Sequence, residues 1–497
     1  MKKLTRRDAL LATAAMGAVP ATRAKAQTTL ALENAPMSDV IQALASRRVT
    51  ATALTKGYLA RVEAYDREGP KLNSVRELNA DALTIAGKLD DTRPSVKQPL
   101  AGVPILVKDN IATGDKQPTT AGSLALEGAR ARGDAVVVRL LRDAGAVILG
   151  KANLTEFANM LAIDMPSGYS SLSGQVKNPY APTLMDDRDI PVVLPGGSSS
   201  GPAVAVAAGL CAASIGTETS GSLLSPATQG QRRPADYTAD LAHDAMKGAR
   251  IGVPSDPADP LNDCYYGKLP PRLAKVMADA IKVLEDLGAV IVRASMPTAG
   301  WIGGPGTTMA VLNRNPLSRN KGNPATPPIV FLYELKRDLN LYLKDWATNT
   351  RIKTIADIVA FNEANPGRAL RFGQDLFLAA NLTKGDLSEL EYKSARAMDL
   401  LAAKTRGMDA YMNQHKLDAV LFPGTAGAAI AAKAGYPSVM VPGGFISGSP
   451  TAKDTPDYPF GVTFAGRAWS EHKLLRLAYA YEQASHMRKP PPGLLAL

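Results

Sequence analysis

One lysine of this sequence stands where a charged side chain is costly. Lys108 follows the apolar run 103–107 (Val-Pro-Ile-Leu-Val), which predicts a buried strand ending at the lysine. A lysine kept away from water can lose its proton near neutral pH and then serve as a base. The alternative interpretation is a structural lysine that reaches the surface or pairs with the adjacent Asp109.

Two turns that contain serine are the second chemical feature. The segment 196–201 (Gly-Gly-Ser-Ser-Ser-Gly) opens a predicted helix at Pro202, where glycines permit tight turns beside free helix N–H groups. A phosphate-binding loop is excluded, because no Lys-Ser or Lys-Thr pair follows these glycines. The segment 216–222 (Gly-Thr-Glu-Thr-Ser-Gly-Ser) ends on a serine, in a turn whose backbone N–H groups could stabilise an oxyanion. Each segment alone is also typical of an ordinary loop.

A serine nucleophile needs a base, and histidine is a poor candidate here. The four histidines are all distant in sequence from both serine turns: His243, His415, His472 and His486. His243 stays open as a base, but a lysine that activates serine is the simpler hypothesis. The two cysteines, Cys211 and Cys264, are too few for a disulfide framework or a cysteine-built zinc site.

The elements that must position these residues alternate between strands and helices. Short apolar runs predict strands at 74–78, 103–107, 146–149, 419–422 and 438–441. Helical spacing of apolar residues predicts two helices within 37–66 and further helices at 80–89, 134–143 (capped by Asp134), 202–213, 332–343 and 471–487. This alternation predicts the α/β class, as a single large domain with a central mixed β-sheet covered by helices.

Composition supports a globular protein and argues against nucleic acid as a partner. The chain has 497 residues, with 45% hydrophobic and 21% charged residues, which excludes disordered and fibrous classes. The formal net charge is 57 − 46 = +11, and residues 1–27 hold six basic residues against Asp8, a net of +5. The remaining excess is too diffuse to indicate binding of nucleic acid.

Together, the lysine and the two serine turns resemble the pattern of the amidase signature family. In that pattern the lysine is Lys108, the loop serine is Ser198 and the nucleophile is Ser222, which lies 24 residues after Ser198. Further segments that resemble the family are 150–157, 178–180, 434–437, 441–445 and 464–467. The resemblance extends from about residue 30 to residue 490, so it implies an amidase domain over 27–497.

The resemblance implies an amidase that hydrolyses a carboxamide C–N bond through an acyl-enzyme, with no metal or organic cofactor. Ser222 would attack the carbonyl carbon, Ser198 in a cis peptide would relay the proton, and neutral Lys108 would be the final base. The oxyanion hole would consist of the backbone N–H groups of Thr219, Ser220, Gly221 and Ser222. The implied partner is a peptide amide or small-molecule amide, and the oligomeric state stays open.

The nucleophile turn departs from the common family pattern. Ser220 stands where the family usually has glycine, and Leu224 stands where it usually has arginine. Glu218 replaces the common aspartate, as in relatives that resemble peptide amidases. These differences favour the exported branch of peptide-amide or small-amide hydrolases.

A family segment is expected to be missing after about residue 228. The family usually continues beyond Ala227 with a Gly-x-x-Gly-x-Lys-Pro stretch and several dozen residues of strand and helix. This chain instead reaches the strand-like segment 250–254 soon afterwards. Because such residues would pack behind the nucleophile, the alternative function is a catalytically impaired, amidase-like protein that binds amides or peptides.

The N-terminus has the order of an export signal of the twin-arginine type. The pair Arg6-Arg7 precedes the apolar stretch 10–19, and Ala24-Lys25-Ala26 offers a cleavage site of small residues. The apolar stretch is too short to span a bilayer. We therefore expect residues 1–26 to be a signal peptide and the mature protein to be periplasmic or secreted. Export argues against a third reading, a transamidase component for aminoacylated transfer RNA, because that chemistry needs cytoplasmic partners.

Overall fold

The computed structural model describes residues 30–92, 97–218, 241–300, 329–447 and 455–494. Its elements up to the second serine turn are, in chain order, α2 (Met37–Ala45), α3 (Ala51–Arg61), the π-helix η1 (Val62–Arg67), β1 (Val75–Leu78), α4 (Ala82–Asp90), β2 (Pro104–Lys108), the 3-10 helix η2 (Leu124–Leu126), β3 (Arg130–Ala131), α5 (Val136–Asp143), β4 (Val147–Ala152), the 3-10 helix η3 (Glu156–Asn159), β5 (Tyr169–Ser170), β6 (Gly174–Gln175), α6 (Ser200–Ala207) and β7 (Ala213–Ile215).

The C-terminal elements continue the alternation of strands and helices. They are β8 (Arg250–Pro254), α7 (Pro271–Asp286), β9 (Val290–Ala294), α10 (Ile329–Asp345), β10 (Ala347–Thr348), α11 (Ile355–Ala364), α12 (Pro366–Ala369), α13 (Asp375–Asn381), α14 (Leu390–Asp399), the π-helix η5 (Leu400–Asp409), α15 (Ala410–Gln414), β11 (Ala419–Pro423), α16 (Ala428–Ala434), β12 (Ser438–Ile446), β13 (Tyr458–Ala465) and α17 (Glu471–Ser485).

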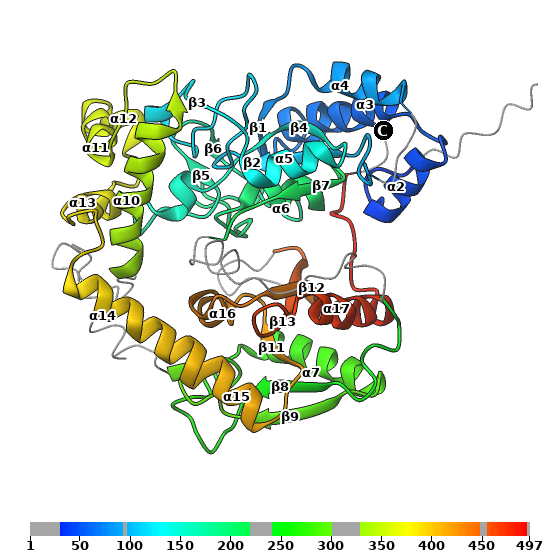
Figure 1. Ribbon diagram of the computed structural model, residues 1–497. Coiled ribbons are helices and arrows are strands. Elements are labelled where there is room, and N and C mark those ends of the chain that lie inside the picture. The colour runs from blue at the N-terminus through cyan, green and yellow to red at the C-terminus, as the bar shows by residue number, and fades with distance from the viewer. Residues whose placement is uncertain (1–29, 93–96, 219–240, 301–328, 448–454, 495–497) are drawn as a thin grey trace, which may run out of the picture.

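Most strands belong to two mixed sheets (Figure 1). The first has the order β1-β4-β2-β7, with β2 parallel to both of its neighbours and β1 antiparallel to β4. The second has the order β12-β13-β11-β8-β9. In it, β8 is parallel to both of its neighbours, β9 and β11, whereas β13 is antiparallel to both of its neighbours, β11 and β12. The predicted α/β class, a single domain with mixed sheets covered by helices, is confirmed, and the described strands divide between these two sheets.

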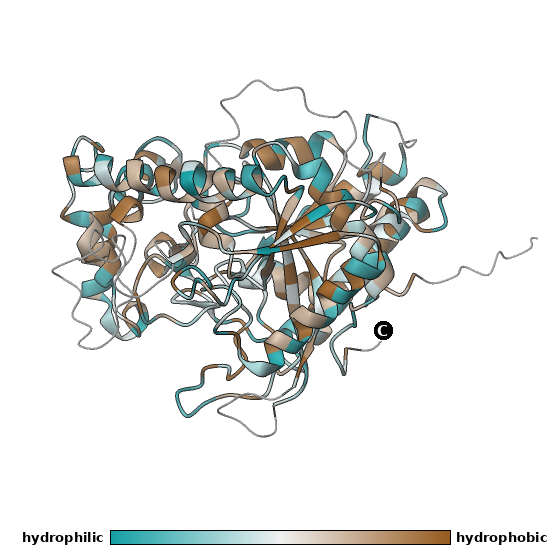
Figure 2. Cartoon of the chain, turned by 90° about the horizontal axis from the view of Figure 1, so that it is seen from below, coloured by the Kyte–Doolittle hydropathy of each residue, from teal (hydrophilic) through white to brown (hydrophobic). Residues whose placement is uncertain are grey.

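The parallel strands β2 and β7 of the first sheet end beside the first serine turn, 196–201. Helices α3, α4 and α6 pack with this sheet in one apolar cluster that includes Leu54, Leu106 and Val204. On the other face of β2, Val107 packs with Val138 of α5. Because successive side chains of a strand alternate between faces, Lys108 lies on the same face as Leu106. In Figure 2 the hydrophobic colour is concentrated on strands in the middle of the view, with mixed colour on the helices around them.

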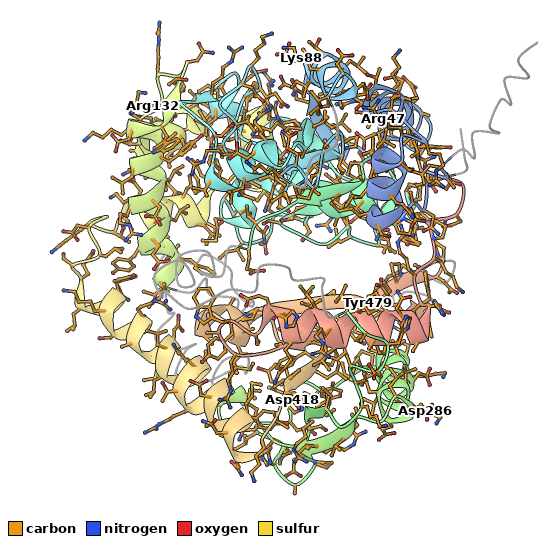
Figure 3. All side chains as sticks on the ribbon, turned by 45° about the vertical axis from the view of Figure 1, so that its right-hand side comes forward. Arg47, Lys88, Arg132, Asp286, Asp418 and Tyr479 are labelled. Atoms are coloured by element: carbon orange, nitrogen blue, oxygen red, sulfur yellow. The ribbon has the colours of Figure 1, made fainter. Side chains whose placement is uncertain are left out.

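The second sheet has its own cover and core. Helices α7 and α17 contribute Met277 and Leu474 to a cluster that contains Ile251 of β8 and Leu421 of β11. Figure 3 marks charged residues on the outer surfaces around the first sheet (Arg47, Lys88 and Arg132) and around the second (Asp286 and Asp418).

Two helix predictions were wrong in detail. Asp134 does not cap α5: the helix follows Ala135, and the Asp134 carboxylate accepts the N–H of Gly114 at 2.7 Å and pairs with Arg142 at 3.0 Å. The helix predicted for 202–213 ends at Ala207. There Gly209 takes a positive φ of 64°, and buried Arg61 donates to the carbonyl oxygens of Ala208 and Gly209. The helix therefore ends here, and the chain continues into β7 at Ala213.

Candidate active site

Lys108 is the buried end of β2, and its amine faces a serine turn. Its side chain is 0% exposed, and Nζ donates to the hydroxyl of Ser198 over 2.7 Å. The two residues are 90 positions apart in sequence. The predicted meeting of the lysine with the first serine turn is present, whereas the surface lysine and the pair with Asp109 are not the arrangement observed.

Burial changes the proton affinity of this amine. Removal from water lowers the pKa of Lys108 from 10.5 to about 7, and the carboxylate of Glu218 acts weakly in the opposite direction. A lysine with a pKa near neutrality is uncharged in much of its population at physiological pH, so it can accept a proton. The electrostatics are those of a base.

The turn that carries Ser198 is held by Thr155, in the segment that follows β4. The peptide bond between Gly197 and Ser198 is cis, as the resemblance implied, and the N–H of Thr155 donates to the carbonyl oxygen of Ser198 over 3.0 Å. The space beside Gly197 is occupied, because a Cβ there would lie 2.7 Å from the Thr155 hydroxyl oxygen. The Ser200 hydroxyl closes the turn by donating to the carbonyl oxygen of Gly196 over 2.6 Å.

Two polar neighbours of Lys108 were not singled out by sequence reasoning. Nζ donates to the Thr217 hydroxyl over 2.8 Å, and the side-chain amide of Asn110 donates to that same hydroxyl over 3.1 Å. Thr217 follows β7 and Asn110 follows β2, and these strands are parallel neighbours. The available signal was that polar residues placed just after two adjacent parallel strands meet at one edge of the sheet.

The remaining predicted site residues lie outside the described residues. They are the nucleophile Ser222 and the oxyanion-hole residues Thr219, Ser220 and Gly221. The described chain reaches Glu218 immediately before them. Among the described residues, the titratable side chain that contacts the first serine turn is Lys108, whereas His243 packs its ring against Tyr479 of α17.

A second buried lysine lies on the opposite face of the same sheet. Lys151 of β4 is in register with Val107 and therefore points away from Lys108. Its amine donates to the carbonyl oxygen of Ile111 at 2.5 Å and lies 3.9 Å from the carboxylate of Asp109, which also pairs with Arg76 at 2.9 Å. Asp109 therefore pairs with Arg76 and Lys151 rather than with Lys108.

A cavity lies between Glu218 and elements of the second sheet. It has a volume of about 320 Å³ and a largely apolar wall from α16, β12 and β13, with polar groups at Glu218, Thr425, Tyr436 and Thr463. Glu218 directly follows Thr217, whose hydroxyl accepts from the Lys108 amine. Its size is that of a small organic group.

No group of three or more His, Cys, Asp or Glu residues in the described ranges is arranged to hold a metal ion. None of the helices in the part of the chain that the structure describes combines the length and apolarity needed to cross a membrane.

Comparison with known proteins gives one consistent result. A family model described as Amidase matches residues 53–231. A probable amidase of Arabidopsis thaliana is 33% identical over 95% of this chain and 94% of its own length. The solved native peptide amidase of Stenotrophomonas maltophilia is 34% identical, with a TM-score of 0.75 over 92% of this chain and 98% of that one. A glutamyl-tRNA(Gln) amidotransferase component of Chloroflexus aurantiacus is 28% identical over 91% of this chain and 97% of its own.

The α/β fold and the similarity to amidases over nearly the whole chain define an enzyme of the amide-hydrolysing class. The chain belongs to the amidase signature family. The resemblance inferred from its motifs is confirmed, including its likeness to a peptide amidase.

Proposed function

We propose that this amidase cleaves carboxamides through a serine acyl-enzyme, with Ser222 as nucleophile, Ser198 as proton relay and Lys108 as base. The observation that carries the proposal is the 2.7 Å contact between the buried Lys108 amine and the Ser198 hydroxyl. A lysine with a pKa of about 7 can do the work that histidine does in other serine hydrolases.

The proposed steps conserve protons and electrons. Ser222 Oγ forms a bond to the amide carbon while its proton passes to Ser198 Oγ and the Ser198 proton passes to Lys108 Nζ. The backbone N–H groups of 219–222 stabilise the oxyanion. Collapse breaks the C–N bond, and the leaving amine receives the proton back through Ser198. Water then attacks the ester on Ser222 by the same relay and releases the acid.

The proposed substrates are peptide amides and other small carboxamides. Supporting this choice are the likeness to a peptide amidase at 34% identity and the sequence of the turn, with Glu218 and Ser220 in place of the common aspartate and glycine. The cavity beside Glu218 offers room for one small group of such a substrate.

Fluorophosphonate labelling tests the relay without knowledge of the substrate. The reagent should form one phosphonyl ester on the tryptic peptide that contains Ser222, with loss of fluoride, as read by intact mass and peptide mapping. Lys108→Met and Ser198→Ala should each slow labelling and ammonia release from a peptide amide by about 10³-fold or more, because either change interrupts proton transfer.

Matched variants separate chemistry from folding. Ser214→Ala removes a hydroxyl of β7 that donates to the carbonyl oxygen of Leu106, and it should label at the wild-type rate. Ammonia release that persists in Ser222→Ala would refute the assignment of the nucleophile. A folded wild-type protein that binds peptide amides saturably, yet neither labels nor releases ammonia, would favour the catalytically impaired binding protein.

We further propose that residues 1–26 direct export to the periplasm by the twin-arginine route. The support is the order of the Arg6-Arg7 pair, the apolar stretch and the Ala24-Lys25-Ala26 site. Cell fractionation should place the wild-type chain in the periplasm and an Arg6→Lys/Arg7→Lys variant in the cytoplasm. Cytoplasmic wild-type protein that co-purifies with partner proteins would instead support the transamidase reading.

A further inference from the structure

The hydroxyl of Thr217 lies between two donors, one of them the proposed base. Lys108 Nζ approaches it at 2.8 Å and Asn110 Nδ2 at 3.1 Å. The Thr217 backbone is fixed on both sides by the Ser199 hydroxyl, which accepts the Thr217 N–H at 3.1 Å and donates to the Thr217 carbonyl oxygen at 3.2 Å. The hydroxyl is therefore held at one position relative to the amine.

Hydrogen-bond capacity decides how the amine is oriented. A hydroxyl oxygen has two lone pairs, and here Asn110 and Lys108 each donate to one of them. Asn110 thus keeps Thr217 in the role of an acceptor toward the amine. A neutral amine that donates one N–H to Thr217 keeps its single lone pair available. The Ser198 oxygen, which accepts from Nζ at 2.7 Å in the structure, is close enough for its own hydroxyl proton to turn toward that lone pair when the amine is neutral.

We propose that Thr217 and Asn110 are positioning residues that orient the neutral Lys108 amine with its lone pair toward Ser198. The proposal rests on the proposed function, since it concerns the base of that reaction. Asn110 acts through Thr217, and Thr217 acts through Lys108.

The charged groups around Lys108 do not orient its amine, so this role falls to the uncharged side chains of Thr217 and Asn110. Glu218 is the carboxylate that acts on Lys108 from the Thr217 segment. Asp109, next to Lys108 in the chain, is engaged by Arg76 and by the hydroxyl of Thr120. Lys151 of β4 lies on the opposite face of the sheet, where it donates to the Ile111 carbonyl oxygen.

Removal of the Thr217 hydroxyl should change both proton affinity and rate. The ammonium form loses a charge-assisted hydrogen bond, which is stronger than the bond made by the neutral amine, so Thr217→Val should lower the pKa of Lys108 by about one unit. The misoriented lone pair should lower kcat by about 10- to 100-fold at pH values where Lys108 is neutral.

Asn110→Leu tests whether the amide acts through Thr217. Without the amide donor, the Thr217 hydroxyl can turn its own proton toward the lysine lone pair, where it competes with Ser198. This variant should lower kcat by about 10-fold with little change in KM. Because Asn110 acts on Lys108 only through the Thr217 hydroxyl, the Asn110→Leu/Thr217→Val double variant should be no slower than Thr217→Val alone.

The pKa of Lys108 can be read directly by titration of ¹³Cε-labelled lysine in the NMR spectrum, with the signal assigned by its loss in Lys108→Met. Ammonia release from a peptide amide between pH 5 and 9 gives the kinetic profile. Thr217→Ser keeps the hydroxyl and should restore the wild-type pKa and most of kcat. Ser214→Ala, which removes a neighbouring hydroxyl without contact to Lys108, should leave both unchanged.

The outcomes separate this inference from the proposed function. A wild-type Lys108 that titrates near pH 7 in a protein that never releases ammonia would defeat the proposed function, while the downward pKa shift in Thr217→Val would still support the hydrogen bond to the amine. An active enzyme in which Thr217→Val leaves the pKa unchanged, or in which the two substitutions add fully, would overturn the inference.

Discussion

At the scale of single residues, two buried lysines of one sheet show how partners set chemistry. Lys108 faces hydroxyl groups of Ser198 and Thr217, while Lys151 on the other face donates to a backbone carbonyl and lies near Asp109. Burial lowers the pKa of both, to about 7 for Lys108 and to about 8 for Lys151, where Asp109 opposes the shift. The lysine without an adjacent carboxylate partner in direct contact is the one suited to act as base.

Lys108 should make the free energy of unfolding depend on pH. Its pKa is about 7 in the folded protein and 10.5 in the unfolded reference, so between these values the unfolded chain binds more protons. Stability from this group therefore rises with pH across that window and is lowest below pH 7. Lys108→Met should flatten the rise and stabilise the protein at pH 7 by about 2–4 kcal/mol, because it removes the cost of a buried ammonium.

Urea unfolding of both proteins between pH 6 and 9 measures this effect. A loss of activity accompanied by a gain in stability would mark Lys108 as a residue retained for function rather than for folding. Lys151→Met is the comparison on the opposite face: it also removes a buried amine with a lowered pKa, but it leaves Asp109 with one cation fewer, so it should stabilise the fold less than Lys108→Met. A Lys108→Met protein as pH-dependent as the wild type would contradict the lowered pKa.

At the scale of elements, α6 packs backbone to backbone against the end of β4. A Cβ on Gly201 would overlap the carbonyl oxygens of Ser74 and Asn153. The N–H of Gly201 donates to the Asn153 carbonyl oxygen at 3.0 Å, and the N–H of Asn153 donates to that of Ser74 at 2.8 Å. Buried Asp66 holds Ser74 in turn, accepting its N–H at 2.6 Å. Glycine is required here for close approach of backbone to backbone.

Gly201→Ala should therefore push α6 away from β4. We expect a loss of about 3 kcal/mol or more in the free energy of unfolding, because backbone atoms cannot move aside as a flexible side chain can. The control is Gly367→Ala in α12, where a Cβ meets no atom within 4 Å and a change within about 0.5 kcal/mol is expected. Thermal and urea unfolding measure both; equal effects of the two substitutions would show that this contact is not close-packed.

The same elements show what could be predicted from the sequence. Strand β2 and its terminal lysine follow from a local apolar run, and Ser198 follows from a motif at fixed spacing, so neither needs knowledge of long-range contacts. The role of Thr217 depends on the pairing of β2 with β7, more than a hundred residues apart, which periodicity does not encode. The end of α6 was missed because Arg61, distant in sequence, caps it.

At the scale of the whole molecule, the site draws on both sheets. The cavity beside Glu218 takes its wall from α16, β12 and β13 of the second sheet, whereas Lys108 belongs to the first. The segment after α17 runs back to the first sheet (Figure 1). Leu494 is only 6% exposed within the core of that sheet. On the way, the carbonyl oxygen of Lys489 accepts the hydroxyl of Tyr180 at 2.7 Å, and the Lys489 amine lies over the ring of Phe445 in β12.

This returning segment should stabilise the arrangement of the two sheets, and Leu494 is its buried anchor. Leu494→Ala should lower the free energy of unfolding by about 2–4 kcal/mol, because a buried leucine leaves a cavity when truncated. Leu261→Ala is the control, since Leu261 is 81% exposed and its loss should change stability by less than about 0.5 kcal/mol.

If anchoring also sets the distance between Glu218 and the second sheet, Leu494→Ala should raise KM for a peptide amide more than it lowers kcat. Unfolding curves and initial rates on the two variants decide the matter: matching stabilities would show that the segment lies on the surface without anchoring either sheet.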